Sequence, residues 1–173
     1  MPVKSAAGPL ELSAERWFQF PVDRVWALCV SKEGLESWWS PEDLRTTVKR
    51  IEPHLGGQLV LSLRYVPAMV GKKHAETFQA AGVPISFTLQ GNFSEFERER
   101  SLTLAMTLIL DRAGAGIETQ TRLRFEPVAG GTRVRLEVQG KEEPHMMTLG
   151  KANLEGQLER LGLALSSSAS ASG

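Results

Sequence analysis

The sequence predicts an α+β domain in which a curved antiparallel sheet wraps around one long C-terminal helix. From Leu10 to Phe20 and again from Arg45 to Val138, apolar and polar residues alternate along successive segments separated by turn residues, as in strands with one solvated face. From Pro144 to Leu165, apolar residues recur instead at helical spacing. No other predicted helix is large enough to cover the apolar face of the sheet. The apolar stripe of this helix contains Met147, Leu154, Leu158, Leu161 and Leu165.

The first part of the chain is predicted to form a strand followed by two short helices. Residues alternate from Leu10 to Phe20, which predicts a strand with Arg16 on the inward face and Trp17 on the outer face. Pro21 then begins a short helix, and Gly34 separates it from a second short helix that contains Trp38 and Trp39.

The rest of the chain up to the C-terminal helix is predicted to be a meander of about six strands. Short turns such as Gly56-Gly57 and Ala129-Gly130-Gly131 separate the segments. Gly91 interrupts the alternation of its segment and predicts a bulge or a sharp bend. The predicted strands are Arg45–Glu52, Leu59–Tyr65, Pro84–Glu97, Leu102–Leu110, Ile117–Glu126 and Arg133–Val138.

Composition and charge favour one folded domain in the cytoplasm. The chain has 173 residues and a net charge of zero, so its charge gives no argument for nucleic acid as a partner. One cysteine excludes an internal disulfide, and the N-terminal residues lack the apolar core of a signal peptide. No membrane insertion is expected. Residues 10–165 are predicted to form the domain, and the small, polar segments 1–9 and 166–173 to be disordered.

Three motifs, in this order, resemble a known family. They are FQFPVDRVW (Phe18–Trp26), EGLESWW (Glu33–Trp39) and LGGQL (Leu55–Leu59). Their order and spacing are similar to the domain homologous to the activator of the heat-shock chaperone ATPase. That family belongs to the START-like, Bet-v-allergen-like SRPBCC superfamily, and the resemblance implies its helix-grip fold. The superfamily uses this fold for lipid carriers, receptors, cyclases, co-chaperones and stress-response proteins, so the resemblance alone does not select a function.

The resemblance implies a ligand-binding cavity between the curved sheet and the C-terminal helix. An empty cavity of ~300 Å3 would cost on the order of 7 kcal/mol, which is large compared with a total stability of about 5–15 kcal/mol. Polar residues on inward faces could orient a ligand, although a rim position for Arg16 and Tyr65 and simple strand propensity for the threonines explain them equally well. The predicted cavity residues are Arg16, Trp38, Tyr65, Phe87, Leu89, Phe93, Met106, Thr119, Thr121, Met147, Gly150 and Leu154.

The segment Val66–Gly82 is longer than the family's usual connection between these strands. Long loops inside a compact domain often act as lids, so Met69, Val70 and Phe78 are predicted to close the mouth of the cavity. A surface insertion without a function is the alternative.

Sequence patterns for other chemistry are absent. The three histidines are scattered without metal-ligand spacing, and no phosphate-binding, dinucleotide-binding or nucleophile motif occurs. We therefore expect no metal, no cofactor and no catalytic residue. Glu95 and Glu97 are interpreted as solvated strand charges and Cys29 as a buried, unreactive thiol.

Three functions remain open. The first is a non-enzymatic carrier or sensor of a hydrophobic small molecule, such as a lipid or a polyketide. The second is a co-chaperone-like domain that binds a protein partner or forms a homodimer through an exposed apolar patch at Trp17, Trp39 or the 66–82 segment. The third is a polyketide cyclase or aromatase, which would need Arg16 or Tyr65 to move a proton deep in the cavity.

Overall fold

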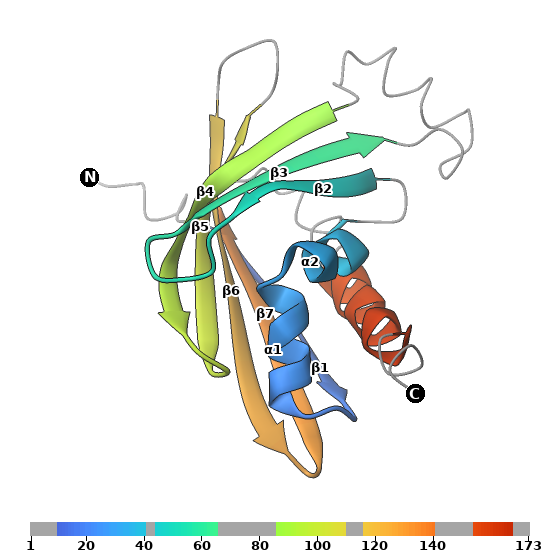
Figure 1. Cartoon of the computed structure of the whole chain (residues 1–173). Helices are drawn as coiled ribbons and strands as arrows, with labels where there is room; N and C mark the ends of the chain where they lie inside the picture. Colours follow the sequence, from blue (N-terminus) through green and yellow to red (C-terminus); the bar gives the residue numbers. More distant parts are fainter. Residues whose placement is uncertain (1–9, 41–43, 66–85, 110–115, 141–153, 168–173) are drawn as a thin grey trace.

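Seven antiparallel strands form one curled sheet in the computed structural model, which describes residues 10–40, 44–65, 86–109, 116–140 and 154–167 (Figure 1). The strand order is β1-β7-β6-β5-β4-β3-β2. Every neighbouring pair after β1 is consecutive in the chain, as predicted for a meander, and β1 joins at the far side of β7. The strands are β1 (Leu10–Phe18), β2 (Leu44–Ile51), β3 (Gln58–Tyr65), β4 (Ser86–Glu97), β5 (Ser101–Ile109), β6 (Gly116–Val128) and β7 (Gly131–Gly140).

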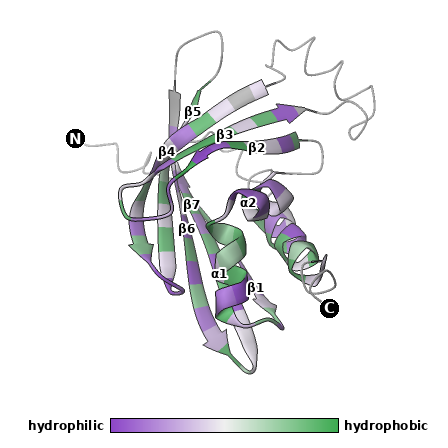
Figure 2. Cartoon of the chain, in the orientation of Figure 1, coloured by the Kyte–Doolittle hydropathy of each residue, from purple (hydrophilic) through white to green (hydrophobic). Residues whose placement is uncertain are grey.

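The register of the strands gathers the apolar residues on one face, which we call the inward face. Leu136 of β7 is opposite Leu123 of β6, and Leu123 is opposite Leu102 of β5. All three are fully buried. Their chain neighbours point to the other face, which is why the alternating stripes of Figure 2 run across the sheet. The period of two in the sequence therefore predicts the sheet and its buried side correctly.

Gly91 marks a close approach between two strands of the sheet. It lies opposite Met106 of β5, and a side-chain carbon at this position would overlap the carbonyl oxygen of Ala105. The predicted bulge is nearby, because the register of β4 and β5 shifts between Phe93 and Glu95. A residue without a side chain lets the two backbones approach each other, and the bulge adds local twist.

Two short helices follow β1, as the sequence predicts, but they separate at Val30 and Ser31, and Gly34 lies inside the second helix. They are α1 (Val22–Cys29) and α2 (Lys32–Trp38). Trp26 of α1 packs edge-to-face on the inward residues Phe96 and Phe125, so α1 covers one end of the inward face. The Ser31 hydroxyl caps α2 by accepting a hydrogen bond from Gly34 N at 3.1 Å. A side chain at Gly34 would overlap the backbone of Leu28, so glycine permits the tight corner between the helices.

The C-terminal helix is described over 154–167. Its buried stripe consists of Leu154, Leu158, Leu161 and Leu165, the residues that the helical period predicts. Gly162 of this helix lies against the ring of Phe18 in β1. The helix is therefore next to the β1 edge of the sheet, on the side where α2 also lies (Figure 1). None of the helices in the described ranges is long and apolar enough to span a membrane.

Candidate functional site

The inward face has a closed part, where side chains from the sheet and the helices pack without exposure. Leu61, Phe93 and Leu104 of the sheet are essentially inaccessible to solvent, and so are Trp38 of α2 and Leu158 of the C-terminal helix. These residues belong to one continuous apolar cluster. We call this region the closed floor, because its side chains are almost completely covered by one another.

The inward face also has an open end. Its residues occupy inward register positions, yet they are only half-buried: Leu12, Leu63, Leu108, Thr119 and Val138. Leu12 and Val138 are directly opposite each other, and Leu108 is opposite Leu89 of β4. Four of the five are apolar side chains that pack against the core with one side uncovered. The open end is therefore an apolar surface on the inner side of the sheet that solvent still reaches.

A groove of about 400 Å3 lies between β1 and the C-terminal helix. We call it the β1 groove. Ala14 and Arg16 supply its inward wall on β1, and Leu158 and Glu155 supply the facing wall on the helix. Leu158 is also part of the closed floor, so the groove leads from solvent to the packed interior. Ser13 and Glu15 complete its lining.

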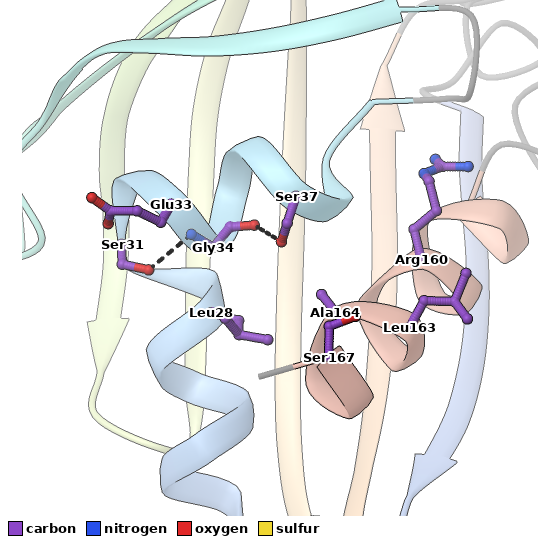
Figure 3. Close-up of a pocket in the computed structure, with 9 residues that line it drawn as sticks. All are labelled: Leu28, Ser31, Glu33, Gly34, Ser37, Arg160, Leu163, Ala164 and Ser167. Carbon is purple, nitrogen blue, oxygen red and sulfur yellow. Dashed lines mark hydrogen bonds between the residues drawn. The ribbon is translucent and has the colours of Figure 1, made fainter. Parts of the chain in front are cut away.

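A second groove, of about 460 Å3, lies between the corner of α1 and α2 and the C-terminal helix. Figure 3 shows the small residues Gly34, Ser37 and Ala164 on its walls, with Leu28 and Leu163 beside them. The Ser37 hydroxyl donates to the carbonyl of Gly34 at 2.5 Å, so this polar side chain is already engaged within the helix. The groove is built from the solvent-facing side of the helices and is separate from the inward face.

Two hydrogen bonds hold the C-terminal helix against α2. Gln157 is buried and donates from Nε2 to the carbonyl of Trp39 at 2.7 Å. One turn further along, Arg160 donates from Nε to the carbonyl of Trp38 at 3.3 Å. Both acceptors lie at the end of α2, where helical carbonyls lack partners within the helix. The two side chains therefore fix the helix that forms one wall of each groove.

The predicted cavity residues divide between these regions. Trp38 and Phe93 belong to the closed floor, so they form packed core and no accessible wall. Leu89, Met106 and Thr121 are buried beside the open end, and Thr119 is part of it. Leu154 is buried on the C-terminal helix. Arg16 lies at the exposed rim. This position does not suit the proton transfer deep in the cavity that the cyclase hypothesis requires of it.

Several predicted residues fall outside what the structure describes. Tyr65 and Phe87 lie on β3 and β4, but their side chains are not described. The lid residues Met69, Val70 and Phe78, and Met147 and Gly150 of the predicted helix, lie outside the described residues.

The structure separates the two tryptophans that are predicted as alternatives for an exposed patch. Trp39 is buried edge-to-face against Trp38 and cannot contribute to such a patch. Trp17 is 43% exposed on the outer face, as its alternation predicts. Glu155 and Ala14 were not singled out because neither breaks its local pattern. Their role in a groove follows only from the placement of the helix beside β1.

Cys29 and Glu95, two titratable groups of the sequence analysis, both lie in the described part of the chain. No cluster of His, Cys, Asp and Glu among the described residues could hold a metal ion. Cys29 is buried, and burial raises the pKa of its thiol well above the usual range, so the nucleophilic thiolate does not form. Glu95 is engaged on the outer face, where it accepts from Thr103 at 2.8 Å and pairs with Arg122 at 3.2 Å.

Comparison with known proteins agrees with this fold. A family model described as Activator of Hsp90 ATPase homolog 1-like protein matches residues 19–165. Among solved structures, the AHSA1 protein of Silicibacter pomeroyi is 18% identical with a TM-score of 0.71, covering 91% of this chain and 98% of that one. A protein from Arthrobacter aurescens is 20% identical with a TM-score of 0.71, over 96% and 90% of the two chains. The AHSA1-like protein of Aeromonas hydrophila is 16% identical with a TM-score of 0.65, over 92% and 94%. No curated protein matches.

Proposed function

Because this chain belongs to the family of Activator of Hsp90 ATPase homolog 1-like proteins, which has an SRPBCC-type fold, we propose that it binds a hydrophobic small molecule as a carrier or sensor. The ligand would lie between the sheet and the C-terminal helix, with the sheet wrapped around that helix as in a helix-grip fold. The wider superfamily uses one fold for several functions, so the argument for binding comes from the site itself.

The observation that carries the proposal is the open end of the inward face. Leu12, Leu63, Leu108 and Val138 occupy core positions of the sheet but remain half-exposed. A protein loses stability when apolar surface of this kind stays in water, at roughly 25 cal/mol per Å2. A bound apolar ligand would recover that free energy, and Thr119 is placed there as a hydroxyl that could orient it.

Binding can be tested with a panel of fatty acids, fatty alcohols, flavonoids and polyketides, measured by native mass spectrometry and thermal unfolding. We expect at least one class to bind with one molecule per chain and to raise Tm. A ligand at about 100 times its Kd stabilises the native state by ~2.7 kcal/mol. Failure of every class to bind, with no shift of Tm, would contradict the proposal.

A pair of variants locates the ligand. Thr119→Phe places a ring in the open end and is expected to weaken binding at least tenfold. Gln120→Phe is the matched control, because Gln120 is the exposed neighbour on the same strand and points to the outer face. Equal binding by both variants would place the ligand elsewhere, for example in the groove of Figure 3.

A protein-binding function is the second candidate, and the exposure of Trp17 favours it. Exposed tryptophans are enriched at interaction hot spots. However, the indole Nε1 of Trp17 donates to the carbonyl of Val128 at 2.8 Å, and its ring lies on Gly131. These contacts give the side chain a structural purpose, since they tie β1 to the hairpin of β6 and β7. A Trp17→Gln variant that still bound a captured partner would remove the support for this candidate.

A further inference from the structure

We propose that the ligand is an amphipathic anion whose carboxylate binds Arg16 in the β1 groove while its apolar body enters the space between sheet and helix. This inference rests on the proposed function and names the chemical class of its ligand. It starts from the position of one guanidinium that pairs with no carboxylate among the described residues.

Arg16 occupies an inward register position, opposite the fully buried Val134 of β7. It is the one charged residue at such a position in the described strands. Burying an unpaired guanidinium would be costly, and Arg16 is exposed instead. Its side chain lies over the ring of Phe18, with Cζ 5.9 Å from the ring centre, and lines the β1 groove. The charge is therefore held at the boundary between the apolar interior and solvent.

The donors of Arg16 are available, unlike those of three arginines on the outer face of β6 and β7. Arg122, Arg124 and Arg133 each pair with a carboxylate, at 3.2 to 3.5 Å. Arg16 makes no hydrogen bond or ion pair among the residues that the structure describes. An arginine presents a planar fork of N–H groups that fits a carboxylate with two parallel hydrogen bonds. The apolar wall beside it, formed by Ala14 and Leu158, fits the first carbons of an aliphatic chain.

Two carboxylates line the same groove and must be weighed against this reading. Glu15 belongs to the outer face and pairs with Arg133 at 3.5 Å, so its charge is already compensated. Glu155 is exposed on the C-terminal helix and makes no ion pair with Arg16. An exposed carboxylate of this kind repels an anion only weakly through water. Arg16, by contrast, is unpaired among the described residues and stands at an inward register position at the rim, where the head group of a ligand with a buried apolar body would lie. The charge of Arg16 therefore determines that the preferred head group is an anion.

The test compares dodecanoic acid, dodecanol and dodecylamine, which share one chain and differ in head-group charge. Binding is measured by calorimetry at low salt for the wild type, Arg16→Gln and Glu155→Gln. We expect the wild type to prefer the acid over the alcohol by about tenfold, as one charge-assisted contact at an exposed site allows. Arg16→Gln should lose that preference and keep its affinity for the alcohol. Glu155→Gln should bind the acid more tightly than the wild type, because it removes a carboxylate from the wall of the groove.

The outcomes separate the inference from the proposed function. If the alcohol binds as tightly as the acid and Arg16→Gln changes neither, the inference is wrong and the proposed function stands. If dodecylamine binds best and Glu155→Gln abolishes its advantage, the ligand is a cation and the inference is also wrong. If no chain-bearing molecule binds and the wider panel also fails, the proposed function falls as well. Unfolding curves of both variants, which alter exposed side chains, check that each remains folded.

Discussion

Glu36 shows how one side chain connects a short helix to the edge of the sheet. Its Oε2 atom accepts hydrogen bonds from Lys32 Nζ at 2.7 Å and from the backbone N of Val48 at 2.9 Å. Val48 belongs to β2, which is the last strand of the sheet order. An unpaired edge N–H can recruit another chain, so a carboxylate that occupies it also protects the edge.

The stability of the protein should depend on the ionisation of Glu36. The hydrogen bond from Lys32, followed by that from Val48, lowers the pKa of this carboxyl. A lowered pKa in the folded state contributes stability that is present above the unfolded pKa of ~4.3 and is lost as the pH falls through the folded value. We expect Glu36→Gln to lower the free energy of unfolding by about 1 kcal/mol at neutral pH, since the group is partly solvated.

Urea unfolding at a series of pH values from neutral into the acid range measures this effect, because the contribution of a carboxyl with a lowered pKa is lost as the pH falls through that pKa. The difference between the wild type and Glu36→Gln should shrink at the acid end. Glu118→Gln is the control, since Glu118 is exposed on β6 and joins no ion pair among the described residues. A difference that stayed constant with pH would show that the charge of Glu36 is irrelevant.

At the scale of elements, the C-terminal helix is placed by polar contacts as much as by its apolar stripe. The leucines would permit the helix to slide or rotate slightly along the sheet, because apolar packing is not directional. Gln157 adds a directional contact, since its amide reaches the carbonyl of Trp39 in a buried setting. This bond fixes the helix relative to α2 and so determines the width of both grooves.

Removing the amide of Gln157 should destabilise the protein although the replacement is apolar. Gln157→Leu keeps the approximate volume but leaves the buried carbonyl of Trp39 without this partner. An unsatisfied buried group costs about 1–3 kcal/mol, and we expect a loss of ~2 kcal/mol in chemical unfolding. Glu159→Gln, on the exposed side of the same helix, should change stability by less than about 0.5 kcal/mol. Equal stability of Gln157→Leu and the wild type would show that packing alone places the helix.

Sequence periodicity predicted the elements well, because burial imposes its own spacing on strands and helices. The leucine stripe predicts the helix, and the alternation around Leu123 and Leu136 predicts the inward face. Periodicity does not predict which apolar residues of the inward face stay half-exposed. Leu104 and Leu108 share one strand and one face, yet only Leu104 is fully covered. That difference depends on where the helices lie over the sheet, which is a tertiary property.

At the scale of the whole molecule, the sheet combines a closed floor with an open end. The closed floor provides the stability, since its side chains have neighbours on every side. The open end has the same kind of residues in the same register but lacks part of this cover. Residues of the two regions should therefore respond differently to the same truncation.

We expect Leu104→Ala to lower the free energy of unfolding by about 3 kcal/mol, because it leaves a cavity in a closed core. Leu108→Ala should cost about 1 kcal/mol, since the side chain is already partly solvated and its neighbours can relax. Ligand affinity should show the opposite order: Leu108→Ala should weaken binding more than Leu104→Ala does. Urea unfolding and ligand titration of both variants measure these quantities, and equal losses of stability would contradict the division into two regions.

The four tryptophans of the chain are distributed so that they report separately on its two sides. Trp26, Trp38 and Trp39 are at most 7% exposed, whereas Trp17 is 43% exposed on the outer face. Short-wavelength fluorescence therefore arises from indoles in the dry interior, and the longer-wavelength component arises from the one indole in contact with water. An aqueous quencher such as iodide reaches only Trp17. The emission that remains in iodide therefore reports changes on the inner side of the sheet, and the quenched emission of Trp17 serves as the reference from the outer face.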